Sequence, residues 1–136
     1  MVSALSLITR RTLSSVQSVA GVTCTEVSIP VPWGAIAGKH WTHEAIEPGE
    51  RKQWIVLHGL LDNAGSFDGL APLLTSACPR HSLLCLDYPG HGLSSHLPRG
   101  QMYHGLECLR YIRIGCLAKN KYSLTIIIPS FPKSRI

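Results

Sequence analysis

The 136-residue chain is long enough for one domain. Its net charge of +5 is unevenly placed: residues 12–109 hold five basic and eight acidic side chains, a charge of −3, and the excess of base lies toward the two ends. A nucleic-acid-binding domain would carry its positive charge on the folded part, so that class is excluded. No apolar run approaches the roughly 20 residues of a membrane span.

The five cysteines are odd in number and have no C-x-x-C spacing. A disulfide framework is therefore not expected, and a reducing compartment is favoured. Residues 1–21 contain two arginines, five serines and no acid, with apolar residues at spacings that allow an amphipathic helix. This composition predicts a mitochondrial presequence. The alternative is a disordered N-terminus of a cytoplasmic protein, and in either case we exclude residues 1–21 from the fold.

Residues 26–41 predict an antiparallel hairpin. Pro30 and Pro32 indicate an edge strand, Trp33-Gly34 supplies the turn, and the apolar pattern resumes up to Trp41. Residues 42–53 are polar and are expected to form a surface loop.

Two buried strands are predicted next, joined by a helix. Residues 54–57 and 83–86 are short apolar runs of the kind found in parallel sheets. The helix between them is expected to begin near Asp68, because Pro72 would then occupy its first turn. Two strands joined by a helical crossover are expected to be parallel. A second helix over residues 106–116 and a further parallel strand over residues 123–128 should follow.

Glycine-rich turns follow both apolar runs. After the first, residues 58–68 read H-G-x-L-D-N-A-x-S-F-D, and after the second, residues 87–94 read D-x-P-G-H-G-x-S. Over residues 26–114 the chain resembles the α/β-hydrolases, and most specifically the serine hydrolase-like proteins. The resemblance implies an α/β fold with a mostly parallel sheet and an antiparallel opening hairpin, of which this chain would hold the N-terminal part. It implies a partial hydrolase domain over residues 22–128 and a tail over residues 129–136.

The resemblance also implies an oxyanion-hole loop at His58, Gly59 and Leu60, with the Leu60 N–H as one donor to the oxyanion. The alternative is that His-Gly only turns the chain, with His58 hydrogen-bonded beneath the loop.

In the second turn, Asp87 is expected to anchor the backbone, Gly90 and Gly92 to permit its path, and His91 to line the mouth of the pocket. Asp87 and His91 could be considered as substitute catalytic groups, but both belong to the turn motif.

The nucleophile of this fold lies in G-x-S-x-G, which the sequence does not contain. Ser130 falls near the expected place, after the strand of residues 123–128, but lacks both flanking glycines. The acid and histidine of the triad would come later still. We therefore expect a truncated family member without catalytic activity. The alternatives are an active esterase, acting on a small acyl or ester substrate, a non-enzymatic binding or regulatory fragment, and a basic-tailed interaction protein of another fold.

Cofactor chemistry is not expected. The histidine pairs His40/His43 and His91/His96 have no cysteine or carboxylate spaced to complete a metal site. The glycines of the second turn lack the third glycine and the following acid of a dinucleotide fingerprint. The sequence therefore predicts neither a metal nor a cofactor, and it leaves the oligomeric state open.

Overall fold

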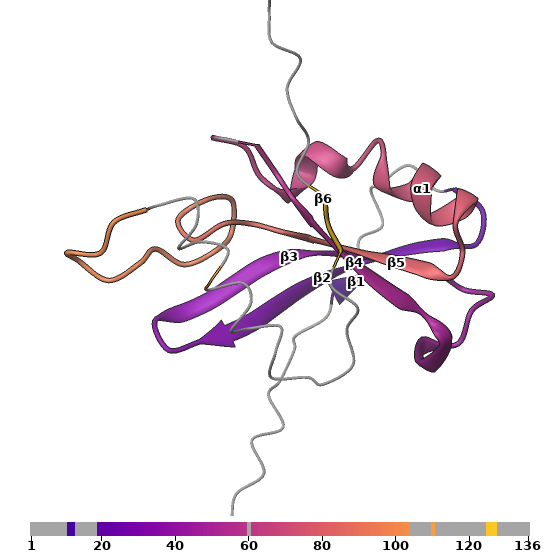
Figure 1. Cartoon of the computed structure of the whole chain (residues 1–136), viewed down its shortest axis with the longest axis horizontal. Coiled ribbons are helices and arrows are strands. Elements are labelled where there is room, and N and C mark those ends of the chain that lie inside the picture. The colour runs from indigo at the N-terminus through magenta and orange to yellow at the C-terminus, as the bar shows by residue number, and fades with distance from the viewer. Residues whose placement is uncertain (1–10, 13–18, 60, 104–109, 111–124, 128–136) are drawn as a thin grey trace, which may run out of the picture.

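The computed structural model describes residues 11–12, 19–59, 61–103, 110 and 125–127. Over these residues the chain forms one mixed sheet with a short helix on one face (Figure 1). The strand order is β1-β2-β3-β5-β4-β6. The strands are β1 (Arg11–Thr12), β2 (Val22–Val31), β3 (Gly34–His43), β4 (Lys52–Leu57), β5 (His81–Leu86) and β6 (Thr125–Ile127).

The predicted opening hairpin is confirmed. Strands β2 and β3 pair antiparallel over their whole length, from Val22 opposite His43 to Val31 opposite Gly34. The two-residue turn between them contains Pro32 and Trp33, one residue earlier than the predicted Trp33-Gly34, because Gly34 is already the first residue of β3. The polar stretch that follows forms a loop with one 3-10 turn, η1 (Pro48–Glu50).

The two apolar runs form neighbouring parallel strands, with Trp54 of β4 opposite Leu83 of β5. Strand β5 also pairs antiparallel with β3, so it joins the hairpin to the parallel part of the sheet. Within the described residues, three of the five strand pairings are antiparallel, because the hairpin and its junction with β5 contribute most of the ladder.

The crossover between β4 and β5 contains two helical segments instead of one. A 3-10 turn, η2 (Ala64–Phe67), comes first, and helix α1 (Ala71–Ala77) follows. The expected start near Asp68 is therefore about one turn too early. Asn63 explains the difference, because its side chain caps η2 by accepting the N–H of Gly65. Pro72 lies in the first turn of α1, as predicted.

Strand β6 lies parallel to β4, with Ile126 opposite Ile55, which confirms a third parallel strand. Most of the predicted second helix lies outside the described residues, although Arg110 is helical. Ser130 and the tail of residues 129–136 also lie outside them. In residues 1–21, Arg11 and Thr12 pair antiparallel with β2.

Apolar side chains cover both faces of the sheet. On one face, Trp41, Val56 and Cys85 pack against Phe67 and Ala71 from η2 and α1. The other face has a second buried cluster, which contains Val27, Ile36, Ile55, Leu57, Leu84 and Leu86. Strands β4 and β5 contribute to both clusters, which explains why their sequences read as continuous apolar runs.

Candidate functional site

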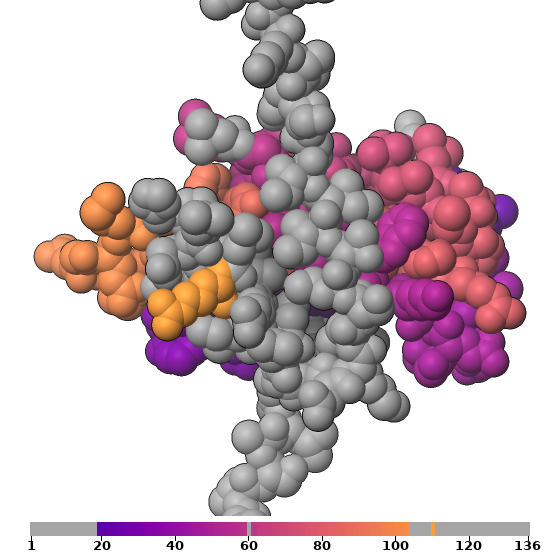
Figure 2. Space-filling model, in the orientation of Figure 1, coloured from indigo at the N-terminus to yellow at the C-terminus, as the bar shows by residue number. Residues whose placement is uncertain are grey.

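The two glycine-rich turns lie together at the carboxyl ends of the parallel strands. The turn after β4 begins at His58, and the turn after β5 begins at Asp87. Figure 1 shows both loops leaving the same end of the sheet, and Figure 2 shows the loop after β5 at the opposite end of the molecule from α1. In open α/β sheets this edge is where ligands bind.

His58 is held by hydrogen bonds from both of its ring nitrogens. Its side chain is 1% exposed. Nε2 accepts the Tyr88 N–H at 3.0 Å, so a neutral imidazole carries its proton on Nδ1, which donates to the Gly59 carbonyl at 2.8 Å. The ring also packs edge-on against Tyr88, with centroids 4.7 Å apart, and lies near His91, with centroids 5.3 Å apart. Tyr88 and His91 therefore fix the orientation of this imidazole.

The loop after Gly59 has an unusual backbone. Leu60 lies outside the described residues, and Leu61 has φ = 60° with its side chain 86% exposed. A leucine in the left-handed region is strained, which is typical of functional loops. Beside it, the nearby Ser66 hydroxyl and the Asn63 N–H, which donates to Oδ1 at 2.9 Å, lower the pKa of Asp62, which favours a charged carboxylate at the loop surface.

Asp87 anchors the second turn and also reaches the first. Its side chain is 5% exposed. Oδ2 accepts the Leu93 N–H at 2.9 Å, within the turn, and Oδ1 accepts the Ala64 N–H at 2.6 Å, at the end of the loop after β4. Gly92 has φ = 49°, and a Cβ there would overlap the Asp87 carboxylate. The glycine is therefore needed for space as well as for its backbone conformation.

Two serines fasten the second turn to the hairpin. The Ser94 hydroxyl accepts the Ala37 N–H at 2.9 Å and donates to the Asp87 carbonyl at 2.8 Å. The Ser95 hydroxyl accepts the Ala35 N–H at 3.0 Å. The sequence alone predicted no contact partner for these serines. The sequence feature that could have indicated this role is the pair of hydroxyl side chains directly after a glycine turn, where such side chains often form hydrogen bonds with backbone groups.

Comparisons with known proteins show the family of this chain. The α/β-hydrolase fold family matches residues 55–128, which is more than half of the chain. The chain belongs to the α/β-hydrolase fold family. It is also 49% identical over 78 residues to a probable serine hydrolase of Drosophila melanogaster, and 38% identical over 102 residues to a human serine hydrolase-like protein. These alignments cover 57% and 74% of the chain, but only 21% and 46% of the relatives.

Solved structures extend the likeness to the fold. A hypothetical protein of Pseudomonas aeruginosa is 32% identical with a TM-score of 0.56, over 74% of the chain and 33% of that protein. A predicted CIB-like hydrolase of Thermoplasma acidophilum is 18% identical with a TM-score of 0.61, over 81% of the chain and 52% of that protein. The chain thus spans about half, or less, of the length of the relatives it matches.

Among the described residues, two hollows can be placed on the helix-bearing face of the sheet. One, of about 410 Å³, lies behind the two turns and is lined in part by Glu26, Lys39, Ala64, Asp87 and Leu93. Lys39 at its edge forms an ion pair with Asp68 at 2.6 Å. The residues around this hollow come from the hairpin and from the two turns. Strand β6 pairs with the opposite side of β4, so it lies away from the hairpin.

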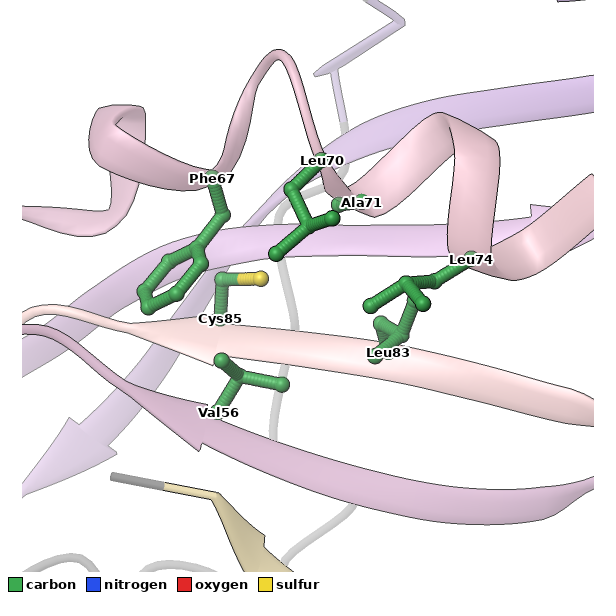
Figure 3. Close-up of a pocket in the computed structure, with 7 residues that line it drawn as sticks. All are labelled: Val56, Phe67, Leu70, Ala71, Leu74, Leu83 and Cys85. Atoms are coloured by element: carbon green, nitrogen blue, oxygen red, sulfur yellow. The ribbon is translucent and has the colours of Figure 1, made fainter. Parts of the chain in front are cut away.

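The second hollow, of about 250 Å³, is entirely apolar and lies beneath α1 (Figure 3). Phe67, Leu70 and Leu74 point into it from the helical segments, and Val56 and Cys85 point toward them from the sheet. Burial raises the pKa of the Cys85 thiol. The described cysteines 24, 78 and 85 are all free thiols.

The remaining predicted site residues fall in different places. His91 lies beside His58, and its Nδ1 is 3.1 Å from the Pro89 carbonyl. His40 and His43 are both on β3, and His96 contacts the Tyr103 hydroxyl at 3.0 Å. Over the described part of the chain, no three His, Cys, Asp or Glu side chains meet in a possible metal site. Nor does any described helix have the length and apolar character needed to cross a membrane.

Proposed function

We propose that this chain carries the oxyanion-binding side of a serine hydrolase site that acts on a carboxylic ester or a related small acyl substrate. The observation that supports this most is the double hydrogen bonding of His58, which fixes the main chain directly before Gly59 and Leu60 at the carboxyl end of β4. In acyl transfer, backbone N–H groups held in place before the reaction stabilise the developing oxyanion. The Leu60 N–H is the donor in this proposal.

The serine hydrolase names of the relatives support the same reaction class. An acyl-transfer site also needs a nucleophile and a base, which this family places in and after G-x-S-x-G. Because the 136 residues contain no such motif, we propose that they do not turn over substrate by themselves. Ser130 remains the serine to test.

The first experiment is labelling of the 136-residue chain with a fluorophosphonate probe, next to the variant Ser130→Ala. We expect no labelling of either protein when both are folded by circular dichroism. Labelling that disappears in Ser130→Ala would show that Ser130 is a nucleophile and would contradict the proposal of an inactive chain.

The oxyanion role needs a catalytically complete protein. A chimera of residues 1–114 with the remaining sequence of the Drosophila relative should hydrolyse p-nitrophenyl esters. In it, Leu60→Pro removes the N–H donor and should lower kcat by about 10²–10³-fold. Leu60→Ala is the matched control, because it shortens the side chain and keeps the N–H. Equal rates for the two variants would refute the assignment of Leu60.

A second candidate function is a non-enzymatic binding or regulatory fragment, which the absence of G-x-S-x-G from the sequence favours. Specific retention of a non-hydrolysable ester analogue by the unlabelled chain would support it.

We also propose a mitochondrial location, with a cytoplasmic one as the alternative. Residues 1–21 fused to a fluorescent protein should direct it to mitochondria, and a diffuse signal would contradict this.

A further inference from the structure

We propose that Asp87 is a positioning residue for the oxyanion loop, which we define as residues 58–64. Its carboxylate holds that loop and the turn of residues 87–93 as a single unit. The consequence for catalysis rests on the function proposed above, whereas the mechanical link between the two segments can be tested without any substrate.

Both carboxylate oxygens of Asp87 accept hydrogen bonds, and the two donors belong to different segments. Oδ1 accepts the Ala64 N–H at 2.6 Å, and Oδ2 accepts the Leu93 N–H at 2.9 Å. Hydrogen bonds to a buried carboxylate are among the strong ones in proteins. The Asp87 main chain is itself fixed, because its N–H donates to the Ala37 carbonyl of β3 at 2.9 Å. The carboxylate therefore belongs to a residue that is fixed on the sheet, and it binds one backbone N–H in each of the two segments.

The oxyanion loop is also held at its other end. His58, its first residue, accepts the N–H of Tyr88, the residue directly after Asp87. Both ends of the loop are thus fastened to two consecutive residues of the second turn. Between the ties lie Gly59 and Leu61, whose backbone path is set by where the ends are held.

The Asp87 carboxylate occupies the space that a side chain at position 92 would need. A Cβ on Gly92 would overlap both the carboxyl carbon and the oxygens of Asp87. A side chain at position 92 would therefore push the carboxylate away from Ala64. Gly100 offers the matched comparison, because it also has a positive φ, of 89°, but no atom lies within 4 Å of its Cβ position.

The test is amide hydrogen exchange and chemical-shift mapping by NMR on the 136-residue chain. In Asp87→Asn, which can accept only one of the two N–H groups well, exchange at Ala64 or Leu93 should accelerate about tenfold or more, as expected for loss of a hydrogen bond to a charged group. The Leu84 amide, in the middle of β5, should keep its exchange rate. The amides of Gly59 and Leu61, which are not the donors to the Asp87 carboxylate, should shift.

Gly92→Ala should produce the same changes at Ala64, Gly59 and Leu61, and Gly100→Ala should not. Asp68→Asn, which removes a carboxylate outside both segments, should also leave those amides unchanged. If Asp87→Asn does not fold, the Gly92→Ala and Gly100→Ala pair decides the question.

Two results would overturn the proposal. One is unchanged exchange at Ala64 and Leu93 in Asp87→Asn. The other is acceleration of Ala64, Leu93 and Leu84 by the same factor, which would show a general loss of stability. Because neither measurement needs turnover, failure of the esterase chimera would leave this result standing, and failure here would not affect the assignment of Leu60.

Discussion

Replacing His58 should break the two hydrogen bonds that fix the start of the loop of residues 58–64. In His58→Ala, the Tyr88 N–H loses its acceptor and the Gly59 carbonyl loses its donor. A buried donor without a partner costs about 1–3 kcal/mol. The imidazole is 1% exposed, so its removal also leaves a cavity. Together we expect a loss of about 2–4 kcal/mol in the free energy of unfolding.

Two substitutions by amide side chains each keep one of the two hydrogen bonds. A glutamine oxygen can reach the position of Nε2 and still accept the Tyr88 N–H, whereas an asparagine NH₂ lies near Nδ1 and can still donate to the Gly59 carbonyl. A buried N–H without an acceptor is rarer in proteins than an under-used carbonyl, which has two lone pairs. His58→Gln should therefore be less destabilising than His58→Asn, by about 1 kcal/mol.

Urea unfolding followed by circular dichroism measures these differences, provided that the slopes of the variants agree. His96→Ala is the control, because His96 is exposed and should change stability by less than about 0.5 kcal/mol. A His58→Asn variant as stable as His58→Gln, or a His58→Ala variant that loses no more stability than the His96 control, would refute these roles of the two hydrogen bonds.

Three further predictions concern the sheet and its surface. Gly38→Ala should lower the free energy of unfolding by about 1–3 kcal/mol in urea titrations, because its Cβ would overlap the Cys85 carbonyl on β5, whereas Gly69→Ala, in open space, should not. Burial raises the pKa of Cys24 to about 11, so its folded-state pKa lies above the unfolded one. The contribution of this protonated thiol to the free energy of unfolding is complete below about pH 9 and is lost as the pH rises to about 11. Alkylation of Cys24, followed by mass spectrometry, should accelerate over that range. Asp68→Asn should cost less than about 1 kcal/mol, and less still in high salt, because its ion pair is partly exposed.

The architecture was largely predictable because local signals agreed with it. The apolar runs at residues 54–57 and 83–86 are β4 and β5, and a helical crossover between them requires a parallel pairing. The hairpin followed from Trp33-Gly34 between two strand-like segments. The helix start was placed too early because Asn63 caps a separate 3-10 turn, and apolar spacing alone does not distinguish one helix from a turn followed by a helix.

The contacts between the two turns were not predictable from local signals. Asp87 was expected to anchor its own turn, and the sequence does not show that its second oxygen reaches Ala64. Similarly, the Ser94 and Ser95 hydroxyls bind backbone groups of β3, far away along the chain. Such partners depend on which strands become neighbours, and that information lies in the sheet order.

The structure explains why these two motifs occur together without identifying a substrate. Adjacent parallel strands bring their following loops to one edge of the sheet, so the residues of one motif satisfy backbone groups of the other. Asp87 and His58 are used in this way, and their substitution should first disturb the loop backbone. The exposed side chains of Leu61 and Leu93 have no such role in the described contacts. Substitutions at these two leucines are therefore expected to preserve the backbone of residues 58–64.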